Sequence, residues 1–283
     1  NLSMPLTVFF AIIFAAFLHA VWNAMVKKGD DKYISLTAVV LGHVPISIVV
    51  IFFTPILSFQ SIPYIFISAI FLSGYEWCLL SAYRLEDYTK VYPIARGTAP
   101  IFILILSLFL FDVSISKFEI IGILVISFGI VILGFQNIKT VKNHSAVVYA
   151  LGTGLFISGY SITDGYGGRA SASPLNYAAC LMILNAIIFL ILLRIMNKPG
   201  VVKKVLSKGK KIFFIGGTLS YIVYATIIWA FTQASIPTVS ALRETSIIFA
   251  LLIGTFFLKE KFTFLKAAGV LTIFFGVMLL KSF

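Results

Sequence analysis

Charged residues are scarce in this sequence, and acidic residues are the scarcest of them. Of the 283 residues, 11% are charged and only 10 are Asp or Glu, whereas 60% are hydrophobic. About a quarter of a soluble domain is charged, so one soluble core could not bury this excess of apolar side chains. Cysteine is rare too. Cys78 and Cys180 lie in apolar runs and provide neither a disulfide framework nor a metal-ligand spacing.

Catalytic motifs are also missing. The sequence has no HExxH and no GxSxG, and Asp164 is the only Asp inside its long apolar runs. Zinc, serine and paired-aspartate mechanisms therefore lack their parts. We expect no enzyme activity, no cofactor and no metal site, which makes an intramembrane enzyme the weakest of the alternatives.

Apolar runs of about 20 residues, enough to cross roughly 30 Å of hydrocarbon, recur along the whole chain. They predict an all-α integral membrane protein with ten transmembrane helices and short loops. The first run is interpreted as a helix rather than a signal peptide, because it lacks a basic n-region and contains His19, Trp22 and Asn23. The predicted spans are 5–26, 33–53, 63–83, 89–111, 118–136, 146–167, 174–195, 212–232, 237–258 and 263–281.

Basic residues gather on one side of the predicted spans. Alternate loops, beginning with the first, hold 17 of the 22 Lys and Arg, and the opposite side holds only Lys117, Arg169 and Lys281. The positive-inside rule makes the basic side cytoplasmic and puts both termini in the periplasm of a bacterial inner membrane. The run Lys198–Lys211 is expected to contact anionic headgroups, which explains the net charge of +12 without nucleic acid.

The chain repeats itself. At an offset of 147 residues, Tyr92–Leu133 matches Val239–Leu280 at twelve identical positions, which include Arg96 on Arg243 and Gly122 on Gly269. A weaker match at an offset of 141 sets His19, Trp22 and Asn23 over Tyr160, Thr163 and Asp164. Five spans per copy is an odd number, so the second copy must cross the bilayer in the opposite sense. We predict inverted five-helix repeats over residues 1–138 and 144–283, joined by the linker 139–143.

Several phrases of the sequence resemble a known family. HAVWNAMVKKG, AYRLEDYTKVYPIARGTAP, YSITDGYGGR and SALRETSIIFALLIGTFFLKEKF are similar to the EamA-type transporters of the drug/metabolite transporter superfamily. The resemblance covers the whole chain and is greatest to a bacterial branch associated with phosphonate utilisation. It implies alternating access around a central cavity. Glu76 departs from the pattern, because that place is expected to be apolar or aromatic.

Ionisable residues inside the membrane are costly and tend to be paired and functional. This chain has five besides its histidines: Glu76, Arg96, Asp164, Arg243 and Glu244. The repeat places Arg96 about 6 Å to the cytoplasmic side of mid-span and Arg243 about as far to the outer side. Each arginine could then bind an anionic group as the cavity opens toward its side, or both could be locked in permanent ion pairs. Pro93 and Pro100, on either side of Arg96, are predicted to form a gate.

Aromatic residues accompany these charges. Aromatic rings with a nearby carboxylate can hold an ammonium group, although some of these rings could equally belong to the interfacial belt. The resulting hypothesis is a secondary transporter of a small zwitterionic or anionic metabolite, with a lipid or lipid-carrier flippase as the alternative. A homo-oligomer is possible. The predicted substrate-binding residues are His19, Trp22, Asn23, Glu76, Trp77, Tyr92, Arg96, Tyr160, Asp164, Tyr224, Arg243 and Glu244.

Overall fold

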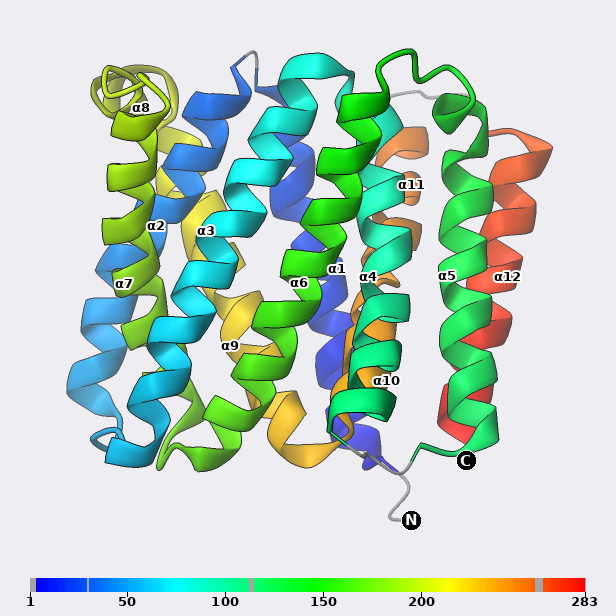
Figure 1. Ribbon diagram of the computed structural model, residues 1–283, viewed down its shortest axis with the longest axis horizontal. Helices are drawn as coiled ribbons and strands as arrows, with labels where there is room; N and C mark the ends of the chain where they lie inside the picture. Colours follow the sequence, from blue (N-terminus) through cyan, green and yellow to red (C-terminus); the bar gives the residue numbers. More distant parts are fainter. Residues whose placement is uncertain (1–3, 30, 112–114, 258–261, 283) are drawn as a thin grey trace.

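The computed structural model describes residues 4–29, 31–111, 115–257 and 262–282, and the protein is helical throughout these ranges, with no strand in them (Figure 1). A 3₁₀ turn, η1 (Phe59–Ser61), precedes α3, and a π-helical turn, η2 (Ile212–Gly216), precedes α9. The helices are α1 (Leu6–Lys28), α2 (Lys32–Phe53), α3 (Ile62–Leu85), α4 (Tyr88–Leu110), α5 (Lys117–Ile138), α6 (His144–Ala170), α7 (Pro174–Ile195), α8 (Val201–Lys208), α9 (Gly217–Gln233), α10 (Ile236–Arg243), α11 (Ser246–Phe257) and α12 (Phe264–Ser282).

Within the described ranges, ten segments are long and apolar enough to cross a membrane, which agrees with the predicted number of spans. Their limits lie within a few residues of the predicted ones. The eighth span combines η2 with α9, and the ninth combines α10 with α11. The match in limits follows from the length of apolar helix that a bilayer requires.

Short polar side chains start several of these helices. Asp31 accepts hydrogen bonds from the backbone N–H groups of Tyr33 and Ile34 at the start of α2. At α5, Ser116 and Glu119 form a capping box, each side chain accepting from the other residue's backbone N–H. Such caps satisfy N–H groups that have no partner in the first helical turn. They fix where each span begins beside its loop.

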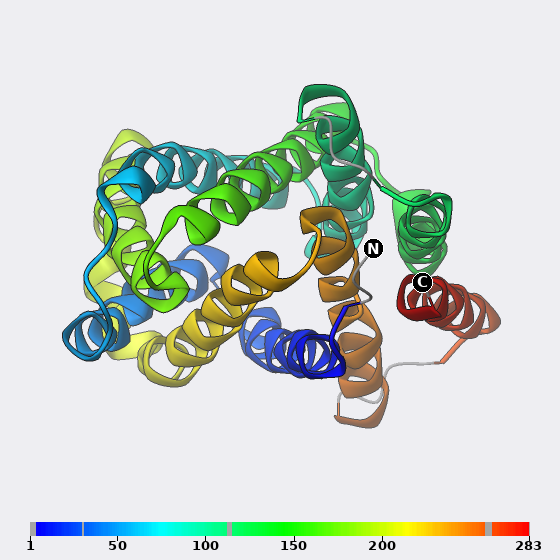
Figure 2. The same ribbon diagram turned by 90° about the horizontal axis from the view of Figure 1, so that it is seen from below.

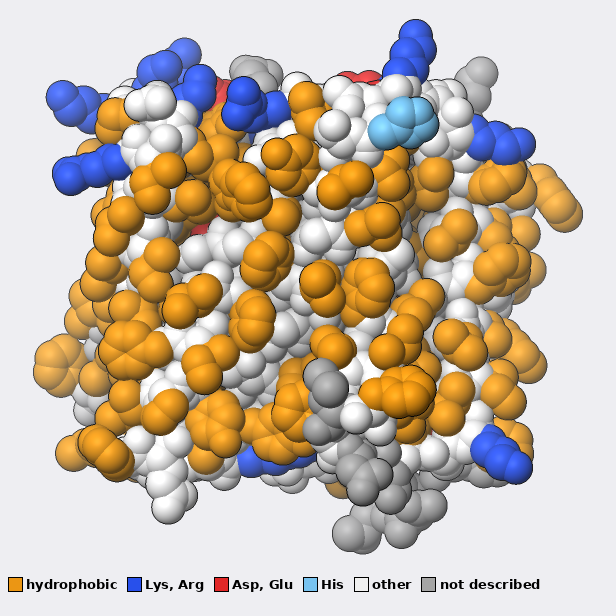
Figure 3. Space-filling view, viewed as in Figure 1, with side chains coloured by type: hydrophobic (Ala, Val, Ile, Leu, Met, Phe, Trp, Pro, Cys, Tyr) orange, Lys and Arg blue, Asp and Glu red, His pale blue; other side chains and the backbone are white. Residues whose placement is uncertain are grey.

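The outer surface has the polarity of a membrane protein. Large apolar side chains are exposed on the flanks, among them Phe52 (80%), Phe128 (63%) and Phe256 (75%). On the face shown in Figure 3, hydrophobic side chains cover the middle, and Lys and Arg lie at the two edges, mostly the upper one. This band fits a surrounding of acyl chains between two polar layers.

The helices pack mostly with partners far away in sequence. Helix α3 packs on α6, α5 on α12, α2 on α7, and α1 on both α9 and α11. Helices α5 and α12 form a pair at one end of the long axis, and α2 and α7 lie at the other end (Figures 1 and 2). This arrangement brings α1, α3, α4, α6, α9 and α10 to the middle of the molecule.

The α5–α12 pair depends on four glycines. A Cβ atom added to Gly129 would lie 3.0 Å from the Gly269 carbonyl oxygen, and one added to Gly276 would lie 2.9 Å from that of Gly122. Gly122 therefore faces Gly276, and Gly129 faces Gly269, so the two helices run antiparallel. Small residues allow this close approach in a membrane, where dispersion contacts drive helix association.

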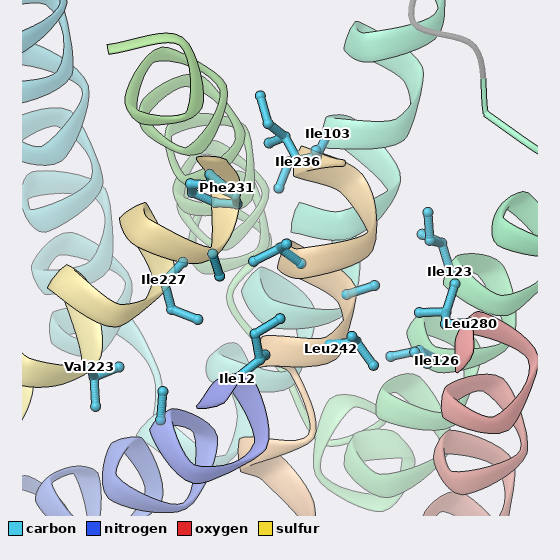
Figure 4. Packing of buried hydrophobic residues seen from close by; sticks show 14 of the residues in the cluster. Ile12, Ile103, Ile123, Ile126, Val223, Ile227, Phe231, Ile236, Leu242 and Leu280 are labelled. Carbon is cyan, nitrogen blue, oxygen red and sulfur yellow. The ribbon is translucent and has the colours of Figure 1, made fainter. Parts of the chain in front are cut away.

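Buried hydrophobic side chains form several clusters, and one of them joins α1, α4, α5, α9, α10 and α12 (Figure 4). Helix α9 presents Val223, Ile227 and Phe231 toward α1 and α10, while Ile126 and Leu280 lie between α5 and α12. The core surrounds the helices that carry the buried charges and holds them in place.

The ninth span is interrupted where the sequence places its second buried arginine. Helix α10 ends at Arg243, and the backbone N–H groups of Glu244, Thr245, Ile247 and Ile248 bond to carbonyls three residues earlier. A stretch of such i→i−3 bonds inside a span is a tight turn of 3₁₀ type. Helix α4, in contrast, continues through both Pro93 and Pro100. The interruption of helical hydrogen bonds that prolines would favour is therefore found in the ninth span and not in α4.

Helix α8 was not predicted as a helix. It lies within Lys198–Lys211, at the basic edge of the molecule (Figures 1 and 3). Val201 and Val205 pack against α2 beside Ile34 and Ala38, while the lysines of α8 stay exposed. An eight-residue amphipathic helix is too short to show clearly in a hydropathy pattern.

Candidate binding cavity

A cavity of about 90 Å³ lies in the middle of the bundle, and we call it the central cavity. Side chains from α1, α2, α3, α4, α6, α7, α9 and α10 line it. Its charged lining residues are Glu76, Arg96 and Arg243. A hollow of this volume has room for several water-sized groups. Its lining is mainly apolar, with a few polar and charged side chains.

The two arginines of the repeat meet at one carboxylate. Nε of Arg96 lies 2.8 Å from Oε2 of Glu244, and Nε of Arg243 lies 3.7 Å from Oε1 of the same residue. Glu244 is fully buried, and each arginine is 5% exposed. One carboxylate balances only one guanidinium, so this end of the central cavity carries a surplus positive charge. We call Arg96, Arg243 and Glu244 the arginine pole.

Donors of the arginine pole remain unused. The Arg96–Glu244 contact is a charge pair without the direction of a hydrogen bond, and Nη2 of both arginines is buried with no hydrogen-bond partner within the described ranges. Buried charged donors without partners are costly. Guanidinium groups bind carboxylates and phosphates through two parallel N–H donors. The arginine pole therefore has donors that no described residue uses.

Aromatic rings surround the arginine pole. The Arg96 guanidinium lies over the ring of Tyr92, 5.8 Å from its centroid. Tyr160 packs between Tyr75, at a centroid distance of 5.9 Å, and Tyr224, at 6.2 Å. Rings at these distances hold one another in offset or edge-on geometry. Helices α3, α6 and α9 are thereby fixed around the cavity.

On α1, His19 and Trp22 lie edge to face, with ring centroids 4.9 Å apart, and both line the central cavity. Asn23, the next residue, donates from its side chain to the carbonyl of His19. Of the three predicted site residues on α1, only His19 and Trp22 therefore line the central cavity, and Asn23 does not.

A second set of polar groups lines the cavity from α2, α3 and α7. Asn185 Nδ2 donates to Oε1 of Glu76 at 2.9 Å, while Glu76 Oε2 has no hydrogen-bond partner among the described residues. His43, on α2, belongs to the same lining. We call Glu76, Asn185 and His43 the acceptor pole.

Asp164 lies outside the central cavity, although its sequence position suggested a binding role. Its Oδ1 accepts from Ser68 Oγ at 2.5 Å and from Tyr177 at 3.1 Å, and its Oδ2 accepts from Tyr224. These donors come from α3, α7 and α9. Three hydrogen bonds satisfy a buried carboxylate, so the geometry gives Asp164 a joining role between helices.

A side cavity of about 160 Å³ lies beside the central one, between α1, α4, α5 and α11. Asn23, Tyr92 and Pro93 line it. The Pro93 ring packs against Gly134 of α5, where an added Cβ would come within 2.3 Å of it. Because Tyr92 also lies under Arg96, the two cavities are neighbours at this ring.

Trp77 does not occupy the cavity position expected for it. Its side chain is 43% exposed and packs edge-on against Tyr149 at the flank of the molecule. Successive helix residues are rotated by about 100°, so when Glu76 faces inward its neighbour turns toward the outside. Glu244 is enclosed between the two arginines, and Pro100 does not contribute to the lining of either cavity.

Four polar residues of the lining are absent from the predicted site: His43, Tyr75, Asn185 and Ser220. Asn185 stands alone in the apolar run LMILNAIIFL. A lone amide in the middle of a span is the signal that could have identified it. No cluster of three His, Cys, Asp or Glu side chains able to hold a metal ion occurs within the described ranges.

Residues 144–282 match the model of the EamA-like transporter family, which is just under half of the chain and runs from the start of α6 into α12. Twenty-eight chains of solved structures match the fold. One of them, a protein crystal structure, is similar over 96% of this chain and 97% of its own, with a TM-score of 0.75 and 15% sequence identity, a likeness that shows the fold alone. Among curated proteins, none matches.

The family match and the ten apolar helices indicate a multi-pass membrane protein. They support a transporter of the drug/metabolite transporter superfamily.

Proposed function

We propose that this chain, whose second half matches a family of transporters, is a secondary transporter of a small zwitterionic or anionic metabolite. The substrate would cross the cytoplasmic membrane by alternating access around the central cavity. Small phosphonates, which the resemblance to the phosphonate-associated branch suggests, belong to this class of anion. The cavity lies at the meeting of eight helices, where bundles place small-molecule sites.

The observation that carries the proposal is the surplus charge of the arginine pole. Two buried guanidiniums share Glu244, and each keeps a donor without a hydrogen-bond partner within the described ranges. A structural ion pair would need equal numbers of both signs, because an uncompensated buried charge is strongly destabilising. An anionic group of the substrate would supply the missing partner.

The packing supports a pair of inverted five-helix halves, 1–138 and 144–283, with 139–143 as the linker. Helix α3 packs on α6, and their counterparts α9 and α1 also pack on each other. The last helices of the two halves, α5 and α12, pack antiparallel through matched glycines. An axis in the membrane plane that exchanges the halves would produce such pairs.

The interrupted ninth span supports a site at the same place. Arg243 ends α10, and α11 begins three residues later at Ser246. Transporters place their binding sites at such discontinuous helices, whose free ends supply partial charges and backbone groups. We propose that Pro93 and Pro100 contribute to gating from α4, where Pro93 borders the side cavity.

We propose a bacterial inner-membrane location with the basic edge cytoplasmic and both termini periplasmic. The termini lie at the edge opposite α8 (Figure 1). The lysines of α8 are exposed at the basic edge, where anionic headgroups would attract them. Substrate and lipids are the proposed partners, and nucleic acid has no part in the proposal.

Transport by arginine variants tests the proposal. The probes are β-alanine, taurine and 2-aminoethylphosphonate, with propionate, ethanesulfonate and ethylphosphonate as their matched analogues without the amino group. Binding to purified protein selects the probe, which is then followed into proteoliposomes. We expect Arg96→Ala and Arg243→Ala each to reduce uptake by about 10- to 100-fold, the worth of a hydrogen bond to a charged group.

Arg84→Ala is the matched control, because Arg84 is exposed at the end of α3. It removes the same side chain without touching the central cavity. Normal uptake by both cavity variants, with folding shown by an unchanged elution profile, would contradict the proposal. Failure of every probe to bind the unmodified protein would contradict it as well.

A further inference from the structure

We infer that the acceptor pole, formed by Glu76, Asn185 and His43, binds a primary ammonium group of the substrate. The inference rests on the proposed function and narrows the substrate from a zwitterion or an anion to a primary amine that also carries an anionic group.

The Asn185–Glu76 hydrogen bond fixes the orientation of the amide. Because Nδ2 of Asn185 donates to Oε1 of Glu76 at 2.9 Å, the amide oxygen is the atom left for another partner. Both Asn185 Oδ1 and Glu76 Oε2 are buried without a hydrogen-bond partner within the described ranges. The two side chains are 2% and 3% exposed. Two acceptor oxygens are therefore free in the wall of the central cavity.

His43 adds a third acceptor from the facing helix α2. Its side chain is 6% exposed, it lines the same cavity, and the part of the chain described by the structure provides no partner for Nδ1 or Nε2. A neutral imidazole carries one donor and one acceptor nitrogen. Since buried polar groups are nearly always hydrogen-bonded, three free acceptors around one hollow indicate an absent donor.

A primary ammonium group fits this set. It has three N–H donors and a positive charge, which match two oxygens, one ring nitrogen and the charge of the Glu76 carboxylate. A trimethylammonium group has no N–H donor and would leave all three acceptors unsatisfied. A second anion would be repelled by Glu76. The acceptor pole thus selects against quaternary amines and against anions.

The charges of the whole cavity favour a molecule with both groups. The arginine pole carries two guanidiniums and one carboxylate, and the acceptor pole carries the second carboxylate. Asp164 accepts hydrogen bonds from three donors of its own and does not line the cavity. Counted together with the enclosed Glu244, the charged lining residues are therefore neutral in sum but divided into a positive and a negative end. A zwitterion complements both ends without adding net charge, whereas a simple anion or a simple amine leaves one charge unbalanced.

Thermal unfolding with the three matched pairs tests the inference on the full-length protein. We expect β-alanine, taurine or 2-aminoethylphosphonate to raise the unfolding temperature more than its analogue without the amino group, because a ligand of the folded state stabilises it by mass action. Glu76→Gln should weaken the amine-bearing member by about tenfold or more, the range of a lost charge-assisted hydrogen bond. Binding of the analogue, which uses the arginine pole and is repelled by the Glu76 charge, should be retained or become tighter.

Two further variants make the result decisive. His43→Phe keeps a ring of similar shape and removes the acceptor, so it should reduce the preference for the amine even if Glu76→Gln does not fold. Glu119→Gln makes the same chemical change in the capping box of α5, outside the central cavity, and should leave the preference intact. N-trimethylated β-alanine should bind no better than propionate.

Four outcomes would overturn the inference. Equal binding of amine and analogue to the unmodified protein would do so while leaving the proposed function standing. An equal loss of both in Glu76→Gln would also do so, as would stabilisation by sodium or potassium ions that depends on Glu76 in place of the amine. If no member of any pair binds the unmodified protein, the inference and the proposed function fail together.

Discussion

Two buried carboxylates, Asp164 and Glu76, differ in how many donors they accept from. Asp164 receives hydrogen bonds from three side chains on three helices, whereas Glu76 receives one, from Asn185. Their burial is similar, at 1% and 3% exposure. A saturated carboxylate joins the elements around it, and an unsaturated one can take a ligand. The hydrogen-bond partners, rather than depth in the membrane, separate the two roles.

Both carboxylates are predicted as site residues from the sequence. Spacing and hydropathy show only that a polar group lies in a span, and they do not show its hydrogen-bond partners. The donors to Asp164 lie 13, 60 and 96 positions away from it in the chain, and the donor to Glu76 lies 109 positions away. The arginine pair was predicted from the repeat, and both members line the central cavity. Their sharing of Glu244 could not be read from spacing, because Arg96 and Glu244 are brought together only by tertiary packing.

Glu86 gives a prediction at the level of one residue. Its carboxylate accepts from Lys90 Nζ and from the backbone N–H groups of Lys142 and Asn143, which ties the α5–α6 linker to the end of α3. These hydrogen bonds, led by that from Lys90, lower the pKa of Glu86 to about 2 from its ordinary value near 4.5. We expect Glu86→Gln to lower the unfolding temperature at neutral pH.

The pH dependence has a definite sign. A lowered pKa in the folded state stabilises the protein above about pH 4.5, and this contribution is lost as the pH falls through about 2. The unfolding temperatures of Glu86→Gln and the unmodified protein should therefore converge over that range. Asp87→Asn is the control, because the Asp87 side chain is 81% exposed. A difference that is constant with pH would contradict the assignment.

At the scale of the elements, the packing of the bundle depends on places where two helix backbones come close together. Helix α2 touches the η2–α9 segment at glycines: a Cβ atom on Gly42 would lie 2.1 Å from the Phe213 carbonyl oxygen, and one on Gly217 would lie 2.5 Å from the Gly42 Cα atom. Neither contact can be relieved by a side-chain rotation, because both involve backbone atoms. The π-helical turn η2 lies at this crossing.

Gly42→Ala should destabilise the protein by about 1–3 kcal/mol or more, as expected when atoms are forced into a packed interface. The shift in unfolding midpoint in detergent measures it. Gly200→Ala is the matched control, because Gly200 has an ordinary negative φ and no atom within 4 Å of an added Cβ. An equal effect of the two substitutions would show that the crossing is looser than described.

Sequence reasoning predicted the ten spans well but not the internal shape of the ninth. Spans are set by hydrophobic length, which the sequence displays directly. The interruption at Arg243–Thr245 has no Pro or Gly to mark it, and the two prolines of α4 lie in a helix that continues. In α4, Pro93 packs on Gly134 of the neighbouring helix. Tertiary contacts thus decide which span breaks, as often in membrane helices.

At the scale of the whole molecule, the distribution of charge predicts orientation. Exposed basic residues gather at the edge that carries α8, and the termini lie at the other edge (Figures 1 and 3). After replacement of Cys78 and Cys180 by Ala, single substitutions Lys204→Cys and Lys117→Cys report each edge, since both lysines are exposed. We expect a membrane-impermeant maleimide to label the Lys117→Cys variant on intact cells and the Lys204→Cys variant only after permeabilisation.

The cysteine-free background is the control for unspecific labelling, and detergent-lysed cells give the maximum for each site. The reverse pattern would place the basic edge outside and contradict the positive-inside assignment. Labelling of both sites on intact cells would contradict the ten-span topology. In that topology an odd number of spans lies between positions 117 and 204, so the two sites are on opposite sides of the membrane.

Glu244 joins α4 to α10 through Arg96 and Arg243, the two guanidiniums that line the central cavity among the described residues. An anion that binds Arg96 or Arg243 in the cavity competes with the Glu244 carboxylate for their positive charge. By thermodynamic reciprocity, an anion that loosens the ion pairs of Glu244 binds more tightly when those pairs are already loose. Anion binding and the strength of the link between α4 and α10 are therefore coupled.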